Sequence, residues 1–323
     1  MQTPTRQEFS EPLPPRPVGT AEAVVWTGVY ALAQLVVVCL TLALIALSGL
    51  GWDSLSSQRM LDLFLEMNLD QSFLVIGVST LGSALALIPL VRWRLGGHWR
   101  ERLQLRPLER RHALLVLGSV LPLSILSNEL YRLCHIWLGL PPAGDTNQAV
   151  QSLSWQVSYP ILVSAVALGP AVGEELVFRG LIGEGLTRRW GVPGGVCLTA
   201  LLFGLAHLSP AHAIATLPLG LFLHWVYLQT RSLWAPIALH FLNNLLVISL
   251  AHFRIEGLPA NHLQIATAFG CLTAIAWRLG TDPVPREDEP QRRLTGTFWN
   301  SWQTVYESWS LLAYTVAFCW SRG

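Results

Sequence analysis

The sequence predicts an all-α membrane protein, a bundle of about eight helices that each cross a lipid bilayer. Three observations carry this prediction: the composition of the 323 residues, the length of their apolar runs and the placement of their arginines. Hydrophobic residues make up 52% of the chain and charged residues only 13%, with a mean hydropathy of +0.43. Soluble domains carry about 25% charged residues. The chain is therefore too apolar for an ordinary soluble domain.

Apolar runs of about 20 residues are long enough to cross the roughly 30 Å hydrocarbon core of a bilayer. Pro170 and Pro210 favour breaks, so the stretches 157–189 and 194–229 admit other divisions. The sequence contains eight such runs, at 23–48, 71–91, 112–138, 157–178, 194–210, 212–229, 232–252 and 261–277.

The basic residues, all of them arginines, support an even number of spans. If the N-terminus is cytoplasmic, most arginines fall in cytoplasmic segments, and the outer loops hold only Arg59 and Arg254. This asymmetry follows the positive-inside rule and places both termini in the cytoplasm. The net charge is +1 and the arginines form short clusters between apolar runs, which excludes a basic surface for nucleic acid.

Composition divides the chain into four parts. Residues 1–20 are rich in Pro, Glu and Gln and lack the pattern of a signal peptide, so we expect a disordered cytoplasmic arm. Residues 21–150 contain the N-terminal transmembrane helices, and residues 151–280 contain a second transmembrane part with most of the polar chemistry. Residues 281–323 begin with a charged, proline-containing linker.

The linker is followed by aromatic residues at nearly helical spacing, which favours a helix lying at the membrane interface. An aromatic face packed on the bundle is an equal alternative, and a ninth span over about 305–320 is a weaker one. These aromatic residues are Phe298, Trp299, Trp302, Tyr306 and Trp309.

Three ionisable side chains, Glu174, Glu175 and Arg179, lie within an apolar stretch. Each costs roughly 2.5–3.5 kcal/mol at membrane depth, so the default interpretation is a functional polar site between helices. On a helix Glu175 and Arg179 are four residues apart and can pair, while Glu174 points about 100° away toward another neighbour. The alternative is a salt-bridged helix start near the cytoplasmic surface.

Two later apolar runs carry further polar side chains. Phe203 and His207 are four residues apart and share one helix face, as do His240 and Asn244. Taken separately, His207 could be a satisfied core histidine, and His240 with Asn244 could be polar contacts between packed helices. His224 receives no functional assignment.

Together, Glu174-Glu175-x-x-x-Arg179, Phe203-x-x-x-His207 and His240-x-x-x-Asn244 on successive apolar runs resemble one known family. It is the family of CAAX prenyl endopeptidases, bacteriocin-processing proteins and abortive-infection proteins, which are intramembrane proteases. The resemblance covers about residues 155–250. Neither the first half of the chain nor the aromatic tail shows a motif of this family.

The resemblance implies a role for each matching residue. Glu174 and His207 would hold and activate a water molecule, and His240 and Asn244 would donate hydrogen bonds to the developing oxyanion, each donor being worth about 3 kcal/mol. Glu175 completes the catalytic set and, with Arg179 and Phe203, would fix its geometry.

A zinc site is the alternative chemistry for the same residues. Glu174, His207 and His240 could supply two histidines and one carboxylate, the ligand set of several zinc proteases. The HExxH ligand pair is missing, and asparagine is a poor zinc ligand. The five cysteines are widely spaced and suggest no further metal site. We therefore expect a metal-free glutamate mechanism without a cofactor.

The predicted function is an endopeptidase that cleaves a lipidated or membrane-tethered protein or peptide in a prokaryotic-type inner or plasma membrane. A non-catalytic scaffold or immunity-type factor and a transporter are the alternatives, although a transporter would more typically show repeat symmetry between its halves. One difficulty remains in the eight-span arrangement. It places Glu174 in the cytoplasmic half of its span and His207 in the outer half of the next, so a bend or a shifted boundary is required.

Overall fold

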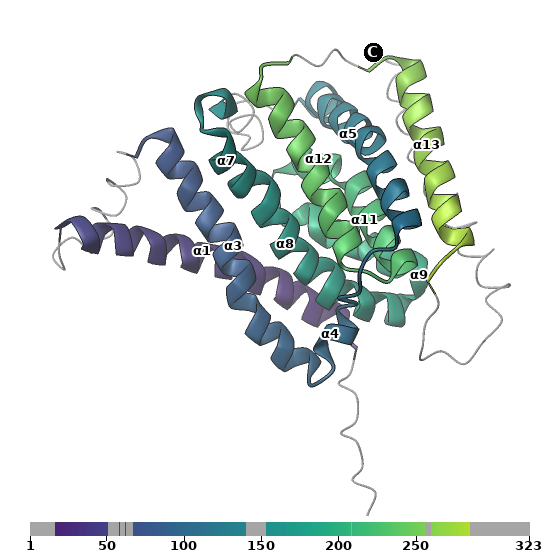
Figure 1. Cartoon of the computed structure of the whole chain (residues 1–323), viewed down its shortest axis with the longest axis horizontal. Helices are drawn as coiled ribbons and strands as arrows, with labels where there is room; N and C mark the ends of the chain where they lie inside the picture. The colour runs from purple at the N-terminus through teal and green to yellow at the C-terminus, as the bar shows by residue number, and fades with distance from the viewer. Residues whose placement is uncertain are drawn as a thin grey trace, which may run out of the picture.

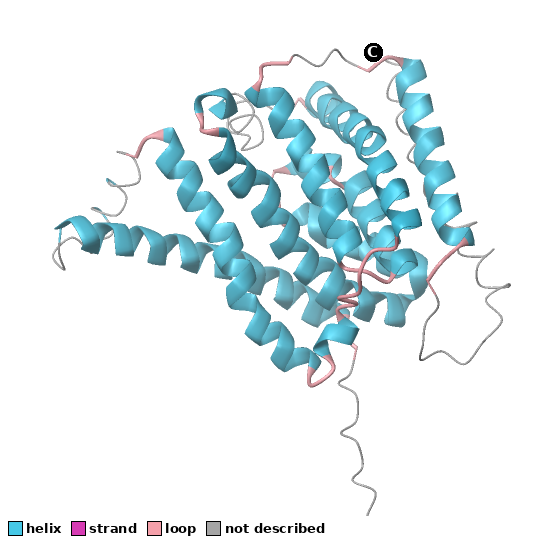
Figure 2. Ribbon diagram, viewed as in Figure 1, coloured by secondary structure: helices cyan, strands magenta, loops and turns pink. Residues whose placement is uncertain are grey.

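The structure, a computed structural model, describes residues 17–50, 58, 62, 67–139, 153–207, 209–255 and 260–284. Over these residues the chain is helical, with short turns and no strand (Figure 2), which confirms the predicted all-α class. Two expectations concern residues outside this part of the chain: most of the N-terminal arm, at residues 1–16, and the aromatic segment after Pro283 and Val284, including Cys319.

Six helical stretches are long and apolar enough, by length and composition, to cross a membrane within the described residues. The longest, from Tyr159 to Leu205, is 47 residues and contains two of the predicted runs. The predicted run 212–229 becomes the short helices α10 (Pro210–Ala215) and α11 (Leu217–Thr230). The other five stretches belong to α1 (Thr20–Leu50), α3 (Leu69–Leu95), α5 (Arg110–Leu138), α12 (Trp234–His252) and α13 (His262–Thr281).

The longest stretch is built from segments of two helical types. Two π-helical segments, η3 and η4, alternate with α-helix, and the helix continues through Gly169 and Pro170, where the sequence favoured a break. The segments are α7 (Tyr159–Leu162), η3 (Val163–Leu168), α8 (Gly169–Glu175), η4 (Leu176–Gly183) and α9 (Glu184–Leu205).

The chain reverses direction inside α9, at Gly191. This residue has φ 72° and ψ 173°, a conformation open mainly to glycine, and Pro193 follows it. On either side of the turn the two arms approach closely: a Cβ placed on Gly195 would lie 2.4 Å from the Cα of Thr187. Residues 159–190 and 192–205 therefore form a tight helical hairpin.

The hairpin resolves the predicted mismatch in depth. The predicted run 157–178 ends too early, because the helix continues to Trp190. Counted from Gly191, Glu174 lies 191 − 174 = 17 residues back and His207 lies 207 − 191 = 16 residues forward. At 1.5 Å per residue both positions are about 25 Å from the turn. Two antiparallel arms of equal length bring Glu174 and His207 to the same level.

The hairpin, α11 and α12 lie in the middle of the bundle (Figure 1). The helices α1 and α3 pack together and cover one side, while α5 and α13 pack together on the other. One apolar core surrounds η4, where Phe178 and Ile182 are fully buried against α1 and α3. A second core lies between α11 and the pair α5 and α13, around Phe222 and Leu223.

Outward-facing residues are those expected for contact with lipid. The sides of α1 and α5 expose Leu44 and Leu114, and large aromatic residues such as Trp93 and Trp190 are exposed at helix ends. Tryptophan is enriched at the interface between membrane and water. Length, hydropathy and exposure together describe an integral membrane protein.

The start of the described chain is packed more firmly than expected for residues 1–20. Val18 is buried and lies against Gly185, and α1 begins at Thr20. One turn later Glu22 accepts hydrogen bonds from Arg94 of α3, at 2.5 Å to Nε and 2.9 Å to Nη2. This ion pair joins the start of α1 to the end of α3.

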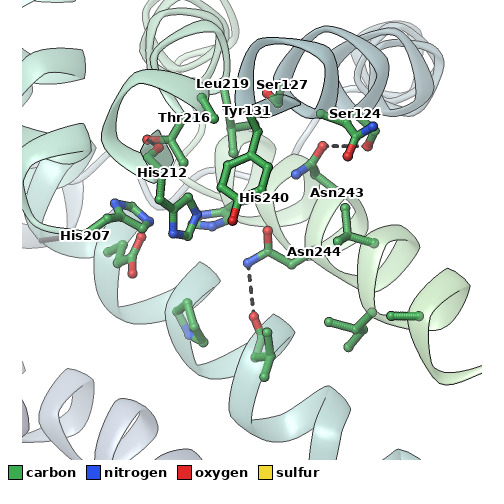
Figure 3. A pocket seen from close by; sticks show the side chains of 18 of the residues that line it. Ser124, Ser127, Tyr131, His207, His212, Thr216, Leu219, His240, Asn243 and Asn244 are labelled. Carbon is green, nitrogen blue, oxygen red and sulfur yellow. Dashed lines mark hydrogen bonds between the residues drawn. The ribbon is translucent and has the colours of Figure 1, made fainter. Parts of the chain in front are cut away.

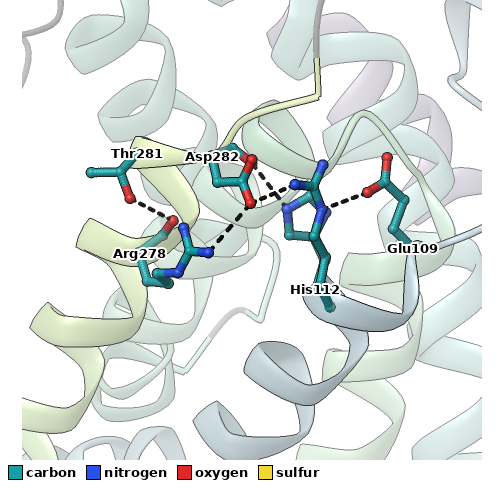
Figure 4. A network of polar contacts seen from close by, with 6 residues as sticks. Glu109, His112, Arg278, Thr281 and Asp282 are labelled. Carbon is teal, nitrogen blue, oxygen red and sulfur yellow. Dashed lines mark hydrogen bonds and ion pairs between the residues drawn. The ribbon is translucent and has the colours of Figure 1, made fainter.

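A second polar network joins the end of α13 to the start of α5 (Figure 4). Asp282 accepts hydrogen bonds from Arg111 at 2.5 Å and Arg278 at 3.5 Å, and its backbone oxygen lies 3.1 Å from Nε2 of His112. The arginines are about half exposed, and exposed pairs contribute little to stability. The network therefore determines the position at which α13 packs against α5 and adds little to the stability of that packing.

Replacing Gly195 by alanine should destabilise the hairpin. The added Cβ meets backbone atoms of Thr187, which cannot rotate away, so the two arms must separate. Overpacking of this kind costs about 1–3 kcal/mol. Denaturant titration in micelles should show that loss for Gly195→Ala and none for the control Gly270→Ala, since nothing lies within 4 Å of a Cβ at Gly270. Equal stability of the two variants would contradict the close approach.

Candidate active site

The two adjacent glutamates lie between the π-helical segments η3 and η4. The π-helix is rare and occurs frequently at functional sites, where its wider turn re-aims side chains. Here the intervening α-helical segment ends at Glu175. The local geometry thus changes on both sides of the pair, and the two carboxylates point to different surroundings.

Glu175 is fully buried and carries two contacts. Its Oε1 atom accepts a hydrogen bond from Arg179 at 2.7 Å and lies 2.8 Å from Nδ1 of His240. The predicted pairing of Glu175 and Arg179 is confirmed. A carboxylate can only accept, so Nδ1 of His240 donates, which leaves Nε2 as the free ring nitrogen. Glu175 thereby fixes the orientation of His240 from behind.

Arg179 is equally buried, and its charge is shared among several partners. Besides Glu175, it donates a hydrogen bond to the backbone oxygen of Gly220 at 3.1 Å. Its guanidinium carbon lies 4.4 Å from the ring centre of Phe203, a cation–π distance. The Phe203 ring also meets His207 and His240 edge to face, at 5.1 and 5.8 Å between centres. Phe203 is therefore packed between the buried cation and both histidines.

A pocket of about 240 Å³ opens beside this buried layer (Figure 3). The structure places Glu174 and His207 in its wall together, as the family resemblance implied and the eight predicted spans did not, and it buries Glu175 and Arg179 behind the wall. The predicted site residues that line the pocket are Glu174, Phe203, His207, His240 and Asn244.

Glu174 and His207 each present an unused atom at the pocket. Nδ1 of His207 lies 2.9 Å from the carbonyl oxygen of Phe203. Because a carbonyl can only accept, this nitrogen carries the proton, and Nε2 keeps its lone pair in the neutral ring. Oε2 of Glu174 is buried without a hydrogen-bond partner among the described atoms. Each side chain therefore keeps one atom that can accept a hydrogen bond or a proton.

Asn244 faces the pocket with part of its hydrogen-bonding capacity already used. Its amide nitrogen donates to the carbonyl oxygen of Val166 at 3.0 Å (Figure 3). The side-chain amide has two N–H donors, so this contact orients the group and leaves one donor available. The bond also joins α12 to η3. This partner was not predicted from the sequence.

Sequence reasoning missed a polar wall supplied by α5. Ser124, Ser127, Asn128 and Tyr131 line the pocket, and their spacing of i, i+3, i+4 and i+7 is that of one helix face. The spacing was visible in the sequence, but these residue types also occur as ordinary contacts between membrane helices. His212 of α10 was missed as well; its ring centre lies 4.4 Å from that of His207.

A zinc site would need three ligands placed around one point. Among the described residues no group of three His, Cys, Asp or Glu side chains is placed to hold a metal ion. Of the three proposed ligands, His240 directs Nδ1 to Glu175 and His207 directs Nδ1 to a backbone oxygen. Glu174, His207 and His240 share a pocket without forming a ligand cluster.

Fold and site define a polytopic α-helical membrane protein whose helices enclose a pocket of glutamate, histidine and asparagine side chains. Residues 156–246 match the family described as type II CAAX prenyl endopeptidase, Rce1-like. The resemblance predicted from the motifs is confirmed over this segment.

One curated relative supports the same assignment. YdiL of Bacillus subtilis (strain 168), whose name marks it provisionally as a membrane peptidase, is 26% identical over 110 residues. This match covers 34% of the present chain and 44% of the relative, so the chain matches less than half the length of that protein. No solved structure matches the chain significantly.

Proposed function

We propose that this protein is an intramembrane endopeptidase that hydrolyses a peptide bond in a lipidated or membrane-tethered protein or peptide. The observation that carries the proposal is that Glu174 and His207 line one pocket together with His240 and Asn244. These side chains come from three different helical segments, and the hairpin at Gly191 brings the first two together.

In the proposed reaction Glu174 is the general base. It takes a proton from a water molecule held between its carboxylate and Nε2 of His207, and the water oxygen bonds to the carbonyl carbon of the substrate. The carbonyl oxygen becomes an oxyanion. When the intermediate collapses, the C–N bond breaks and the leaving amine receives the proton from Glu174. Water is thus consumed, and one carboxylate and one amine are formed.

His240 and Asn244 are proposed to stabilise the oxyanion. Asn244 has one remaining N–H, and His240 can donate from Nε2 when both of its ring nitrogens carry a proton. Such a donor commonly contributes about 3 kcal/mol to the transition state. Glu175 has a supporting role here, because it lies behind the pocket wall with Arg179 and His240 as its partners.

We infer that the reaction needs no metal, because in the described residues the three candidate ligands form no cluster. We also propose that both termini face the cytoplasm, on the arginine distribution. The zinc-dependent protease and the non-catalytic scaffold are the competing outcomes that the experiment below separates.

The test is cleavage of a randomised peptide library, anchored to liposomes by one acyl or one prenyl chain, by the reconstituted protein. We expect cleavage by the wild type to persist in the presence of a zinc chelator and to fall about 10²-fold or more in His207→Ala. Loss of cleavage on chelation, restored by added zinc, would establish the metal reaction. A folded wild type that cleaves neither set of peptides would favour the scaffold.

A further inference from the structure

Four polar side chains on α5 line the pocket from outside the family segment. We call Ser124, Ser127, Asn128 and Tyr131 the polar stripe; they lie on one face of the helix over two turns. The family match begins at residue 156, so it includes none of them. The stripe lies on α5, whereas the proposed reacting groups lie on α8, on α12 and at the end of α9. We call the part of the pocket that carries the reacting groups the chemical wall, and the stripe forms a second, polar wall of the same pocket.

One end of the stripe is fixed to the chemical wall. The Ser124 hydroxyl donates a hydrogen bond to Oδ1 of Asn243 at 2.8 Å, which joins α5 to α12 next to Asn244. With its oxygen held, Asn243 turns its amide nitrogen toward the pocket (Figure 3). The contact orders a hydrogen-bond donor before any ligand binds.

The middle of the stripe has hydrogen-bonding capacity that the protein does not use. The Ser127 hydroxyl oxygen is buried and has no hydrogen-bond partner among the described atoms, like Oε2 of Glu174 in the same pocket. Buried polar atoms in proteins nearly always have partners. Asn128, next to Ser127, is exposed and lines the same pocket. The stripe therefore offers both a buried and an open polar group to a ligand.

The chemistry of this wall favours a peptide over a lipid chain. An isoprenoid or acyl chain has no polar atoms along its length and would leave the buried Ser127 hydroxyl without a partner. A peptide presents one backbone N–H and one C=O per residue, which can meet both walls. The volume of about 240 Å³ is also below the 300–1,000 Å³ typical of pockets for drug-sized ligands, so only a short segment fits.

We propose that the polar stripe binds the substrate's peptide backbone beside the scissile bond, while any lipid anchor stays outside the pocket in the bilayer. The proposal rests on the proposed function, since it assigns the substrate-binding wall of the same site. Tyr131 is a positioning residue in this arrangement: its ring extends across the pocket, and its hydroxyl points to the side of His240 and Asn244 (Figure 3).

The first experiment measures kcat and KM on the liposome-anchored peptide library for Ser127→Ala, Asn128→Ala and Tyr131→Phe. Each variant removes hydrogen-bonding groups without adding bulk, so we expect KM to rise about tenfold, kcat to change by less than about threefold, and the preferred residues around the cleaved bond to change. The control is Ser119→Ala, because this buried hydroxyl donates within α5, to the oxygen of Val116. Unchanged KM and an unchanged cleavage pattern in all three variants would overturn the proposal.

A second experiment measures binding of the peptide library independently of catalysis. Tyr131 is replaced by the photoreactive p-benzoylphenylalanine in Glu174→Gln protein, with Leu121 on the outer face of α5 as the control position. We expect crosslinks from position 131 to the peptide part of the library, with either anchor, and none from position 121. Crosslinks from position 131 to the lipid anchor alone, or no crosslink there, would overturn the proposal.

The two readouts separate this inference from the proposed function. If the wild type cleaves and His207→Ala does not, while the stripe variants behave as wild type, the stripe proposal fails and the protease stands. If the wild type cleaves nothing but position 131 crosslinks the peptide, the stripe proposal holds and the hydrolytic function fails.

Discussion

Glu174→Gln should abolish peptide hydrolysis while leaving the protein folded. Glutamine keeps the size and shape of the side chain but cannot take a proton from water, so we expect kcat to fall by about 10²–10⁴-fold with little change in KM. The substitution loses no hydrogen bond at Oε2, which has no partner among the described atoms. The measurement is cleavage of the anchored peptide library under single-turnover conditions.

The control for this variant is Glu101→Gln, an exposed glutamate on the short helix α4 (Trp99–Arg102), which should behave as the wild type. A thermal melt of each preparation verifies that both variants are folded. If Glu174→Gln kept more than about a third of the wild-type kcat, Glu174 would not be the base, and the role would have to pass to His207 or to a metal-bound water.

Arg179→Met should destabilise the protein more than any exposed substitution. It removes the cation that lies 2.7 Å from Glu175, and both side chains have no exposed surface. Removing one partner of a buried ion pair typically costs about 3–5 kcal/mol, because a charge stays buried without its partner. Denaturant titration in micelles should show a loss of this size in the free energy of unfolding.

The chain offers a matched control for this prediction. Arg188 and Glu184 form a pair with the same spacing and the same 2.7 Å distance, but the Arg188 side chain is half exposed. Arg188→Met should therefore cost no more than about 0.5 kcal/mol. The double variant Glu175→Gln with Arg179→Met should recover part of the loss, since both charges are then removed. Equal losses for Arg179→Met and Arg188→Met would refute the argument from burial.

The sequence was sufficient to predict the class of fold and the contacts between side chains of one helix. Burial of a charge in a membrane is costly enough to mark Glu174, Glu175 and Arg179 as a site, and helical periodicity correctly paired Glu175 with Arg179. The same periodicity placed Phe203 and His207 on one face, where their rings are in contact. These predictions succeeded because they depend on spacing within one helix.

Predictions that depend on tertiary geometry were less successful. The turn at Gly191 lies between the predicted runs, in a Gly- and Pro-rich sequence that favours a turn, but the preceding run was ended at residue 178, so Glu174 and His207 were placed at different depths. The contact between Asn244 and Val166 arises from the way α12 packs on η3. The stripe on α5 was overlooked since serine, asparagine and tyrosine cost far less to bury than charges and so give a weaker signal.

Because of the hairpin turn, the assembly of the pocket depends on the number of residues in each arm more than on the residue types along it. Glu174 and His207 meet because the numbers of residues between each of them and Gly191 are nearly equal. One residue added to a single arm would shift its end by about 1.5 Å and rotate it by about 100°, which turns the side chain out of the pocket. Substitutions of lipid-facing residues along the arms leave this register unchanged, whereas insertions and deletions preserve the site only when they fall outside the arms.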